Sequence, residues 1–370
     1  MNRRATLRAC TYFSLMGILK PNYALSPRSP RVVFLNPGEA VQRGTGKHWQ
    51  LVSKFMAMAA RTFDIELEIL YAERDHLLMQ RQAEEVARRS EPPDYVVIVN
   101  EKMAAQQMLI SLARSPAKIF VIHNDLTPEQ RRGVGNERER FPNWIGTLTA
   151  NAELGGYRLM QFLHQKVHQP EINVIGITGD PNTPVSLERA AGVAAYLAHI
   201  PNARICQLAF SDWSYADSNQ KARVLLARYP GANVIWAAND TMALGALEAA
   251  KVSNSRVVVG GMGALQEALT SVADGGLTAI VAGDYFVGAF AMVMLYDYHW
   301  GKDFSTSEGS RLKLDYLSIV HRKNASRFAD VVFRTEETLD FGLYSKHLHP
   351  RTVVYDFNPE YLFKTMAKKL

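Results

Sequence analysis

Short apolar runs alternate with amphipathic helical segments along most of this chain, and this order constrains its fold more than any other feature. The runs are rich in Val and Ile and contain few polar residues; they cover 32–35, 67–70, 95–99, 119–122, 174–178, 205–209, 233–236, 257–259 and 278–281. Helical periodicity fills the intervals, near 48–60, 75–89, 101–114, 150–167, 187–199, 217–228, 240–251, 264–273 and 285–299. Strands that are apolar along their whole length are covered on both faces, which is typical of a parallel sheet between two layers of helices. The sequence therefore predicts an α/β fold.

The order of strand and helix starts again after Asn143-Trp-Ile-Gly146. A chain of 370 residues is long enough to form two hydrophobic cores. We therefore expect two doubly wound parallel-sheet lobes. Ligands of such sheets bind at the carboxyl ends of the strands, so the expected site is the cleft between the two lobes.

Residues 1–24 have the order of a secretory signal peptide. A basic start with Arg3, Arg4 and Arg8 precedes an apolar run over 9–19, and the segment ends at Ala24. A short N-terminal helix is the alternative, since Asn22-Tyr-Ala24 departs from the preferred cleavage pattern of small residues. We expect export, with the mature chain beginning near Leu25.

Composition and motifs disfavour several classes of function. The chain has 42 Lys and Arg residues against 36 Asp and Glu, but four of the bases lie in the first 24 residues, which hold no acid. The rest is close to neutral, so no nucleic-acid partner is expected. The two cysteines, Cys10 and Cys206, form no zinc-type cluster with histidine, and neither a metal site nor a cofactor is predicted. No nucleophile-elbow, phosphate-loop or His-Glu-x-x-His motif is present, so we expect a protein that is not an enzyme.

The most specific motif lies at 234–249, Val-Ile-Trp-Ala-Ala-Asn-Asp-Thr-Met-Ala-Leu-Gly-Ala-Leu-Glu-Ala. A strand ends in Asn239-Asp240, where a short polar side chain can cap the following helix, and small residues then let that helix approach the sheet. Asp240 is expected either to cap the helix alone or to bind ligand as well. The segment resembles the type I periplasmic sugar-binding proteins and the related ligand domains of the lactose-repressor family.

Further matches to this family follow in the expected order and imply a set of site residues. An aromatic residue near the start of the first helix stacks on sugar in the family, and Trp49 holds that position here, although ordinary helix packing would explain it equally well. The family's arginine that forks onto ligand oxygens corresponds to Arg189. The full set of expected ligand-binding residues is Trp49, Asn124, Asp125, Arg189, Trp213, Asn239, Asp240 and Asp284. His123, beside Asn124, is expected to be structural.

The resemblance also implies how the chain divides. The N-terminal lobe is expected to comprise 31–148 plus about 283–312, and the C-terminal lobe 149–282 plus part of 313–370. A hinge joins the two lobes. Aromatic residues in the tail suggest that 301–370 packs on the lobes.

Two departures from the family leave the exact sugar open. Sugar binders usually carry an acid or amide where this chain has Met262, which offers no strong hydrogen bond. The quorum-signal furanose receptor of the same superfamily has a tryptophan at about that position and an arginine where this chain has Ala282. A borated furanose is therefore disfavoured.

Together, the leader and the resemblance predict a monomeric periplasmic receptor that closes on a small, polar, carbohydrate-like ligand. Its expected partner is the permease of an ABC-type importer. A sensor that signals to the periplasmic domain of a membrane kinase or cyclase is the alternative. A cytoplasmic ligand-binding regulator is the second alternative, but a repressor needs a DNA-binding module before its ligand domain, and the strand at 32–35 begins too early for one.

Overall fold

Two six-stranded sheets organise the computed structural model, which describes residues 28–41, 47–334 and 339–367. The predicted leader, 1–24, lies outside the described residues. The first sheet has the strand order β11-β5-β4-β3-β1-β2 and is parallel throughout. Its strands are β1 (Arg31–Asn36), β2 (Glu66–Tyr71), β3 (Tyr95–Val99), β4 (Lys118–Ile122), β5 (Trp144–Ala150) and β11 (Arg311–Leu314).

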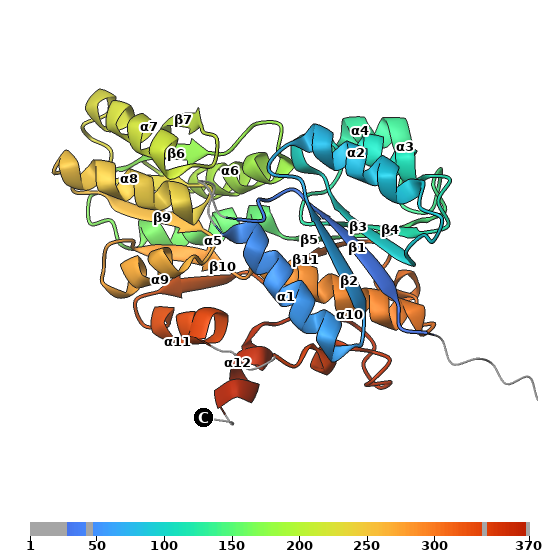
Figure 1. Ribbon diagram of the computed structural model, residues 1–370. Helices are drawn as coiled ribbons and strands as arrows, with labels where there is room; N and C mark the ends of the chain where they lie inside the picture. The colour runs from blue at the N-terminus through green and yellow to red at the C-terminus, as the bar shows by residue number, and fades with distance from the viewer. Residues whose placement is uncertain (1–27, 42–46, 335–338, 368–370) are drawn as a thin grey trace, which may run out of the picture.

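The second sheet has the order β12-β10-β9-β8-β6-β7. Its strands are β6 (Ile172–Thr178), β7 (Ala203–Phe210), β8 (Val234–Ala237), β9 (Val258–Met262), β10 (Ala279–Ala282) and β12 (Ser318–His321). Only β12 runs antiparallel to its neighbour in this sheet. The prediction of an α/β protein with two doubly wound lobes is confirmed (Figure 1).

Helices cover the sheets. They are α1 (His48–Thr62), α2 (His76–Ala87), α3 (Ala105–Leu112), α4 (Pro128–Val134), α5 (Ala152–His164), α6 (Pro184–Leu197), α7 (Tyr215–Arg228), α8 (Asp240–Val252), α9 (Gln266–Ala273), α10 (Val287–His299), α11 (Ala325–Ala329) and α12 (Glu360–Ala367). In β1, Val32 and Phe34 join the core that contains α1 and α10. Val33 and Leu35 join a separate core with α2 and α3. This alternation puts the first sheet between two helix layers.

The chain crosses between the lobes three times. It passes from β5 of the first sheet to α5, which packs on the second, and returns from β10 to α10, which packs against α1. It then enters the first sheet at β11 and the second at β12. Asn151, 283–286 and 315–317 are therefore the segments that connect the two lobes.

The tail lies against the first lobe through a buried carboxylate. Asp297, in α10, is fully buried and accepts hydrogen bonds from Ser345 Oγ (2.5 Å), from the Lys346 backbone N–H (2.7 Å) and from Tyr355 Oη (2.9 Å). Phe357 stacks on Phe290 of the same helix with a centroid separation of 4.4 Å. Across the described residues, no helix combines the length and apolarity needed to cross a membrane.

Candidate functional site

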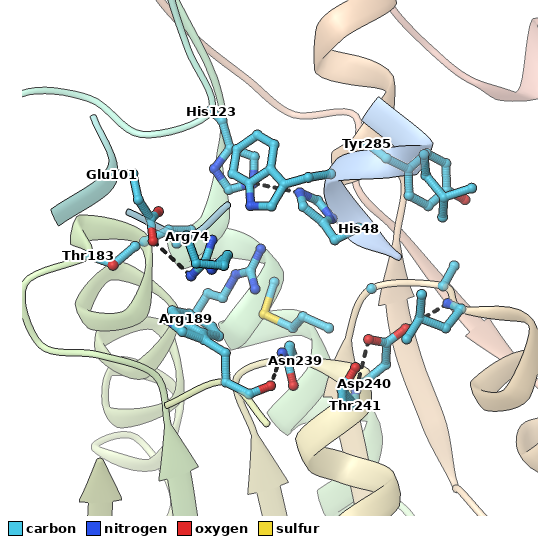
Figure 2. A pocket seen from close by; sticks show the side chains of 18 residues that line it. His48, Arg74, Glu101, His123, Thr183, Arg189, Asn239, Asp240, Thr241 and Tyr285 are labelled. Carbon is cyan, nitrogen blue, oxygen red and sulfur yellow. Dashed lines mark hydrogen bonds and ion pairs between the residues drawn. The ribbon is translucent and has the colours of Figure 1, made fainter. Parts of the chain in front are cut away.

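A cavity that is partly open to solvent lies between the lobes (Figure 2), with about 680 Å³ of space free of protein atoms, part of it open solvent. The first lobe contributes polar and aromatic side chains from segments that follow β1, β2, β3 and β4: His48, Trp49, Arg74, Glu101 and His123. The second lobe contributes Thr183, Arg189, Trp213, Asn239, Asp240, Thr241 and the segment 262–265. Most of these residues follow the carboxyl ends of parallel strands, which meet at one edge of each sheet.

Arg189 is fixed by two buried acceptors. Its Nη1 donates to the carbonyl oxygen of Ala238 (2.7 Å), and its Nη2 donates to Oδ2 of Asp284. The third donor, Nε, is buried and has no hydrogen-bond partner. Burial alone would raise the pKa of Asp284, but the neighbouring His123 and Arg189 outweigh it and hold this pKa below its usual range. Arg189 therefore lines the cavity as a charged, positioned side chain whose Nε–H has no partner.

Asn239 and Asp240 have different hydrogen-bonding roles at the start of α8. Asn239 is the cap, because its Oδ1 accepts from the Met242 N–H at 2.7 Å. Asp240 instead holds the loop after β9: its Oδ2 accepts from the Leu265 N–H at 2.6 Å and its Oδ1 from the Thr241 N–H at 2.9 Å. Burial raises the pKa of Asp240 to about 6, although these backbone N–H groups act in the opposite direction.

Gly263 shows how closely that loop approaches Asp240. Its φ is +129°, a conformation that side-chain-bearing residues rarely adopt, and a Cβ there would lie 2.7 Å from the carboxyl carbon of Asp240. A glycine is therefore required where the loop after β9 passes over the carboxylate.

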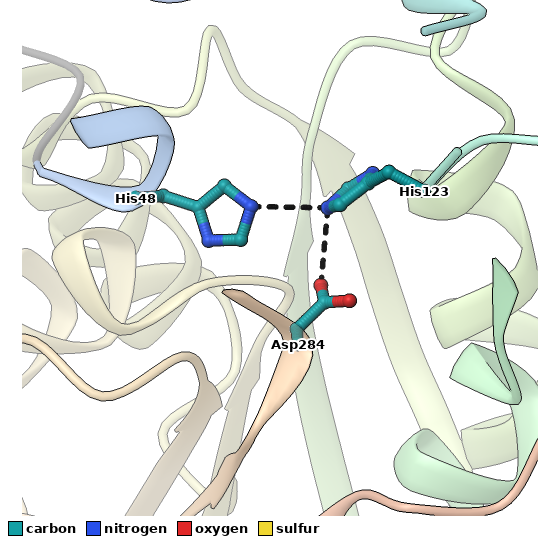
Figure 3. A group of neighbouring side chains, drawn as sticks. All are labelled: His48, His123 and Asp284. Carbon is teal, nitrogen blue, oxygen red and sulfur yellow. Dashed lines mark hydrogen bonds and ion pairs between the residues drawn. The ribbon is translucent and has the colours of Figure 1, made fainter. Parts of the chain in front are cut away.

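An aromatic cluster forms the first-lobe wall. The rings of Trp49 and His123 lie 4.8 Å apart between centroids, and His48 contacts both. Burial, followed by the nearby His123, lowers the pKa of His48 to about 3. His123 has a φ of +69°, and its imidazole faces both His48 and Asp284 (Figure 3).

The structure brings five of the eight expected residues to the cavity: Trp49, Arg189, Trp213, Asn239 and Asp240. Two others lie directly behind it. Asn124 Oδ1 is 3.0 Å from His123 Nδ1, and Asp284 is paired with Arg189 and His123.

The structure does not bring Asp125 to the cavity. Its carboxylate is already paired with Arg131 of α4 at 2.5 Å and with Arg311 of β11 at 2.5 Å. This placement does not support the expectation that Asp125 contacts ligand, because the side chain is committed to two ion pairs at the edge of the first sheet.

Several lining residues were not among those expected from the sequence, namely His48, Arg74, Glu101, Thr183, Thr241 and Tyr285. Arg74 and Glu101 form an ion pair of 2.8 Å. Both follow a strand end by two or three residues, and this position was the signal that could have identified them. His123, expected to be structural, lines the cavity.

Four cavity-lining residues each bear a buried polar atom with no partner in the described part of the chain: Thr183 Oγ1, Arg189 Nε, Trp213 Nε1 and Tyr285 Oη. Buried polar groups are normally hydrogen-bonded, and leaving one unpaired costs about 1–3 kcal/mol. Four such groups on residues that line one cavity are consistent with a site for a molecule that carries several hydrogen-bonding groups.

Comparison with known proteins gives a consistent picture. A family model described as a periplasmic binding protein domain matches residues 41–303. A solved periplasmic sugar-binding protein from Pseudomonas fluorescens is 31% identical, with a TM-score of 0.80 over 90% of this chain and 99% of that one.

Two other relatives are more distant. The ribose import binding protein of Haemophilus influenzae is 28% identical over 183 residues, which span 45% of this chain and 60% of that protein. A solute-binding protein of an ABC transporter from Actinobacillus succinogenes, solved with bound D-allose, is 17% identical with a TM-score of 0.70. It covers 80% of this chain and 99% of its own, and at that identity it shows the shared fold alone.

Proposed function

This chain belongs to the periplasmic binding protein family, and from that premise we propose that it is a receptor for a small, polar, sugar-like solute. The observation that carries the proposal is the set of unpartnered buried polar atoms on four residues that line the cavity, Thr183, Arg189, Trp213 and Tyr285. Three are N–H or O–H donors of arginine, tryptophan and tyrosine, and the threonine hydroxyl can donate or accept. A polyol offers hydroxyl oxygens that satisfy such groups.

The aromatic residues suit the other surface of a sugar. Trp49 of the first lobe and Trp213 of the second lobe both line the cavity. Flat aromatic faces pack well against the apolar C–H face of a sugar ring. The named functions of the relatives support the same solute class, since one is a ribose import binding protein and another is a sugar-binding protein. Met262 also lines the cavity, so this wall adds apolar contact in place of the acid or amide usual in sugar binders.

Binding is proposed to act by closure. Because polar groups reach the cavity from both lobes, a solute that contacts both stabilises the closed arrangement over the open one. We propose that the closed form is then presented to the permease of an ABC-type importer in the periplasm, as the name of the import-binding relative suggests. The relatives are named as binding proteins, which supports a role without catalysis.

A thermal-shift screen of monosaccharides and polyols tests this function. A solute at a hundred times its Kd adds about 2.7 kcal/mol to the free energy of unfolding, so a true ligand raises Tm visibly. We expect at least one aldose or ketose to do so. Absence of a response to every sugar in the panel would contradict the proposed solute class.

Two substitutions then test the site with the solute found. Thr183→Val and Trp213→Phe each remove a polar atom that has no partner in the unliganded protein, so neither loses an internal hydrogen bond. Each is expected to weaken binding about tenfold, the effect of one lost hydrogen bond of about 1.4 kcal/mol. Trp236→Phe is the matched control, because Trp236 Nε1 is also buried and unpartnered but lies in the core of β8. Unchanged affinity in both site variants would refute the assignment.

A further inference from the structure

Three metal-ligating side chains converge at the first-lobe wall of the cavity (Figure 3). His48 Nε2 lies 3.0 Å from His123 Nε2, which lies 3.2 Å from Asp284 Oδ2, and each residue offers a ligand atom within 4.8 Å of the others. They come from three separate places: the start of α1, the end of β4 and the segment after β10. His123 and Asp284 are buried, and His48 is partly buried.

The hydrogen bonds around His123 fix which nitrogen faces the others. Asn124 Oδ1 lies 3.0 Å from His123 Nδ1, so a neutral imidazole that donates this hydrogen bond carries its lone pair on Nε2. In that tautomer Nε2 directs its lone pair toward His48 Nε2 and the carboxylate of Asp284. A cation between these groups, either a proton or a metal ion, would hold them together at the observed distances.

Two of the three separations between ligand atoms also suit a metal. Two ligand atoms bound at 2.0–2.1 Å are about 3.4 Å apart at a tetrahedral angle and about 2.9 Å apart at a right angle. The separations of 3.0 and 3.2 Å fall between these values. Two histidines and one carboxylate form a ligand set used for zinc and for non-haem iron, with further coordination positions left open.

We propose that His48, His123 and Asp284 bind a divalent first-row transition-metal ion whose open coordination position faces the cavity between the lobes. Neighbouring groups support the ligands as they do in known metal sites, where histidine and carboxylate ligands are themselves hydrogen-bonded. Asn124 holds the ring of His123, and Arg189 donates to Asp284.

The charges around the proposed metal ion indicate which ligand its open coordination position accepts. The carboxylate of Asp284 offsets the guanidinium of Arg189, so a divalent ion keeps its positive charge and favours an oxygen ligand. Hydroxyl or carboxylate oxygens of a solute in the cavity meet this need. This last step rests on the proposed solute function, whereas metal binding by the three residues does not.

Calorimetric titration of the tag-free chain with Zn²⁺, after removal of bound metal with a chelator, tests the site in the absence of any solute. We expect one saturable equivalent of Zn²⁺ and no comparable binding of Mg²⁺, which prefers oxygen ligands. Co²⁺ at the same site gives visible absorption bands of nitrogen and oxygen coordination. Absence of a saturable equivalent of Zn²⁺ would overturn the proposal.

Variants locate the ion. His48→Gln and His123→Gln are each expected to weaken Zn²⁺ binding at least tenfold and to alter the Co²⁺ spectrum. His199→Gln, at an exposed position outside the cavity, is the matched control and keeps the affinity of the parent. His48 is only partly buried, so His48→Gln keeps the test informative if His123→Gln fails to fold. Parental affinity in His48→Gln would overturn the assignment.

The sugar screen, run once with a chelator and once with Zn²⁺, separates the two proposals. Zn²⁺ binding without any response to sugar leaves the metal site standing and refutes the solute class. Sugar binding without Zn²⁺ binding supports the solute class and refutes the metal site.

Discussion

Arg189 and Asp284 form a buried ion pair that joins the second lobe to a segment connecting the two lobes. Both side chains are less than one-tenth exposed, and Asp284 also faces His123 of the first lobe. Breaking such a pair by removing one partner leaves an uncompensated buried charge. The stability of this part of the molecule therefore depends on both residues together.

Arg189→Met is expected to lower the free energy of unfolding by about 3–5 kcal/mol, because Asp284 keeps its charge without the guanidinium. Urea denaturation measures the change. The double variant Arg189→Met/Asp284→Asn removes the stranded charge, and it is expected to be more stable than the sum of the single effects implies. Additive effects would contradict a direct pairing.

Asp240 gives the unliganded protein a pH dependence with a definite sign. Its pKa is about 6 in the fold and 3.8 in an exposed state, so the folded chain holds an extra proton between these values. This proton contributes about 3 kcal/mol to the free energy of unfolding. The contribution is fully present below pH 3.8 and is lost as the pH rises through 6.

The comparison of parent and Asp240→Asn from pH 4 to 7 isolates this effect, since other titrating groups cancel in the difference. With rising pH, the free energy of unfolding of the parent is expected to fall relative to that of the variant. A difference that stays constant across this range would show that Asp240 does not titrate there.

Local sequence patterns predicted some of the residues that line the cavity. The motif of strand, cap and helix predicted Asn239 and Asp240, and the family resemblance predicted Arg189 in α6. The ion pairs of Asp125 could not be predicted from local sequence, because its partners lie in a short helix, Arg131, and in a strand far along the chain, Arg311.

Helices α5 and α6 approach each other too closely for side chains at their contact. A Cβ on Gly192 would lie 1.8 Å from the carbonyl oxygen of Glu153, and one on Gly156 would lie 2.2 Å from that of Arg189. Because backbone atoms are the obstacles, rotamer changes cannot relieve the clash. This contact fixes the position of α6 and hence of Arg189.

Gly192→Ala is expected to cost about 1–3 kcal/mol of stability, by separating the two helices, and to weaken solute binding because Arg189 moves with α6. Gly231→Ala is the matched control, since a Cβ at Gly231 meets nothing within 4 Å. Denaturation and calorimetry of both variants give the answer. Equal stability of the two variants would contradict the importance of the helix contact.

Most elements were predicted to within a few residues because apolar runs and helical periodicity are local signals. The exceptions have physical causes. Strand β5, Trp144–Ala150, was not predicted as a strand, because Gly146 and two threonines interrupt its apolar character. It forms a strand because it pairs with β4 and β11. Helix α4, Pro128–Val134, was missed because seven residues give too little periodicity.

At the scale of the whole molecule, the two exposed ion pairs across the cleft give the closed arrangement little support. Lys102 lies 3.8 Å from Asp180, and Lys313 lies 3.5 Å from Glu188. All four side chains are partly exposed, and such pairs contribute about 0–1 kcal/mol each. A solute that contacts both lobes is therefore the expected source of stable closure.

The two-lobed plan followed from the restart of the strand and helix order. The three crossings between lobes could not be predicted from local patterns alone, because β11 and β12 are only four residues long and pair with strands far away in sequence. Their partners become apparent only once the sheets are assembled.

Distance measurement between spin labels on the two lobes tests most directly whether a bound solute holds them closed. Arg132 of α4 and Val224 of α7 are exposed on opposite lobes (Figure 1) and can be replaced by labelled cysteines in a Cys206→Ser background. We predict a broad distance distribution without solute and a shorter, narrower one at saturation with the sugar identified by thermal shift. An unchanged distribution at a saturation verified by calorimetry would contradict closure on the solute.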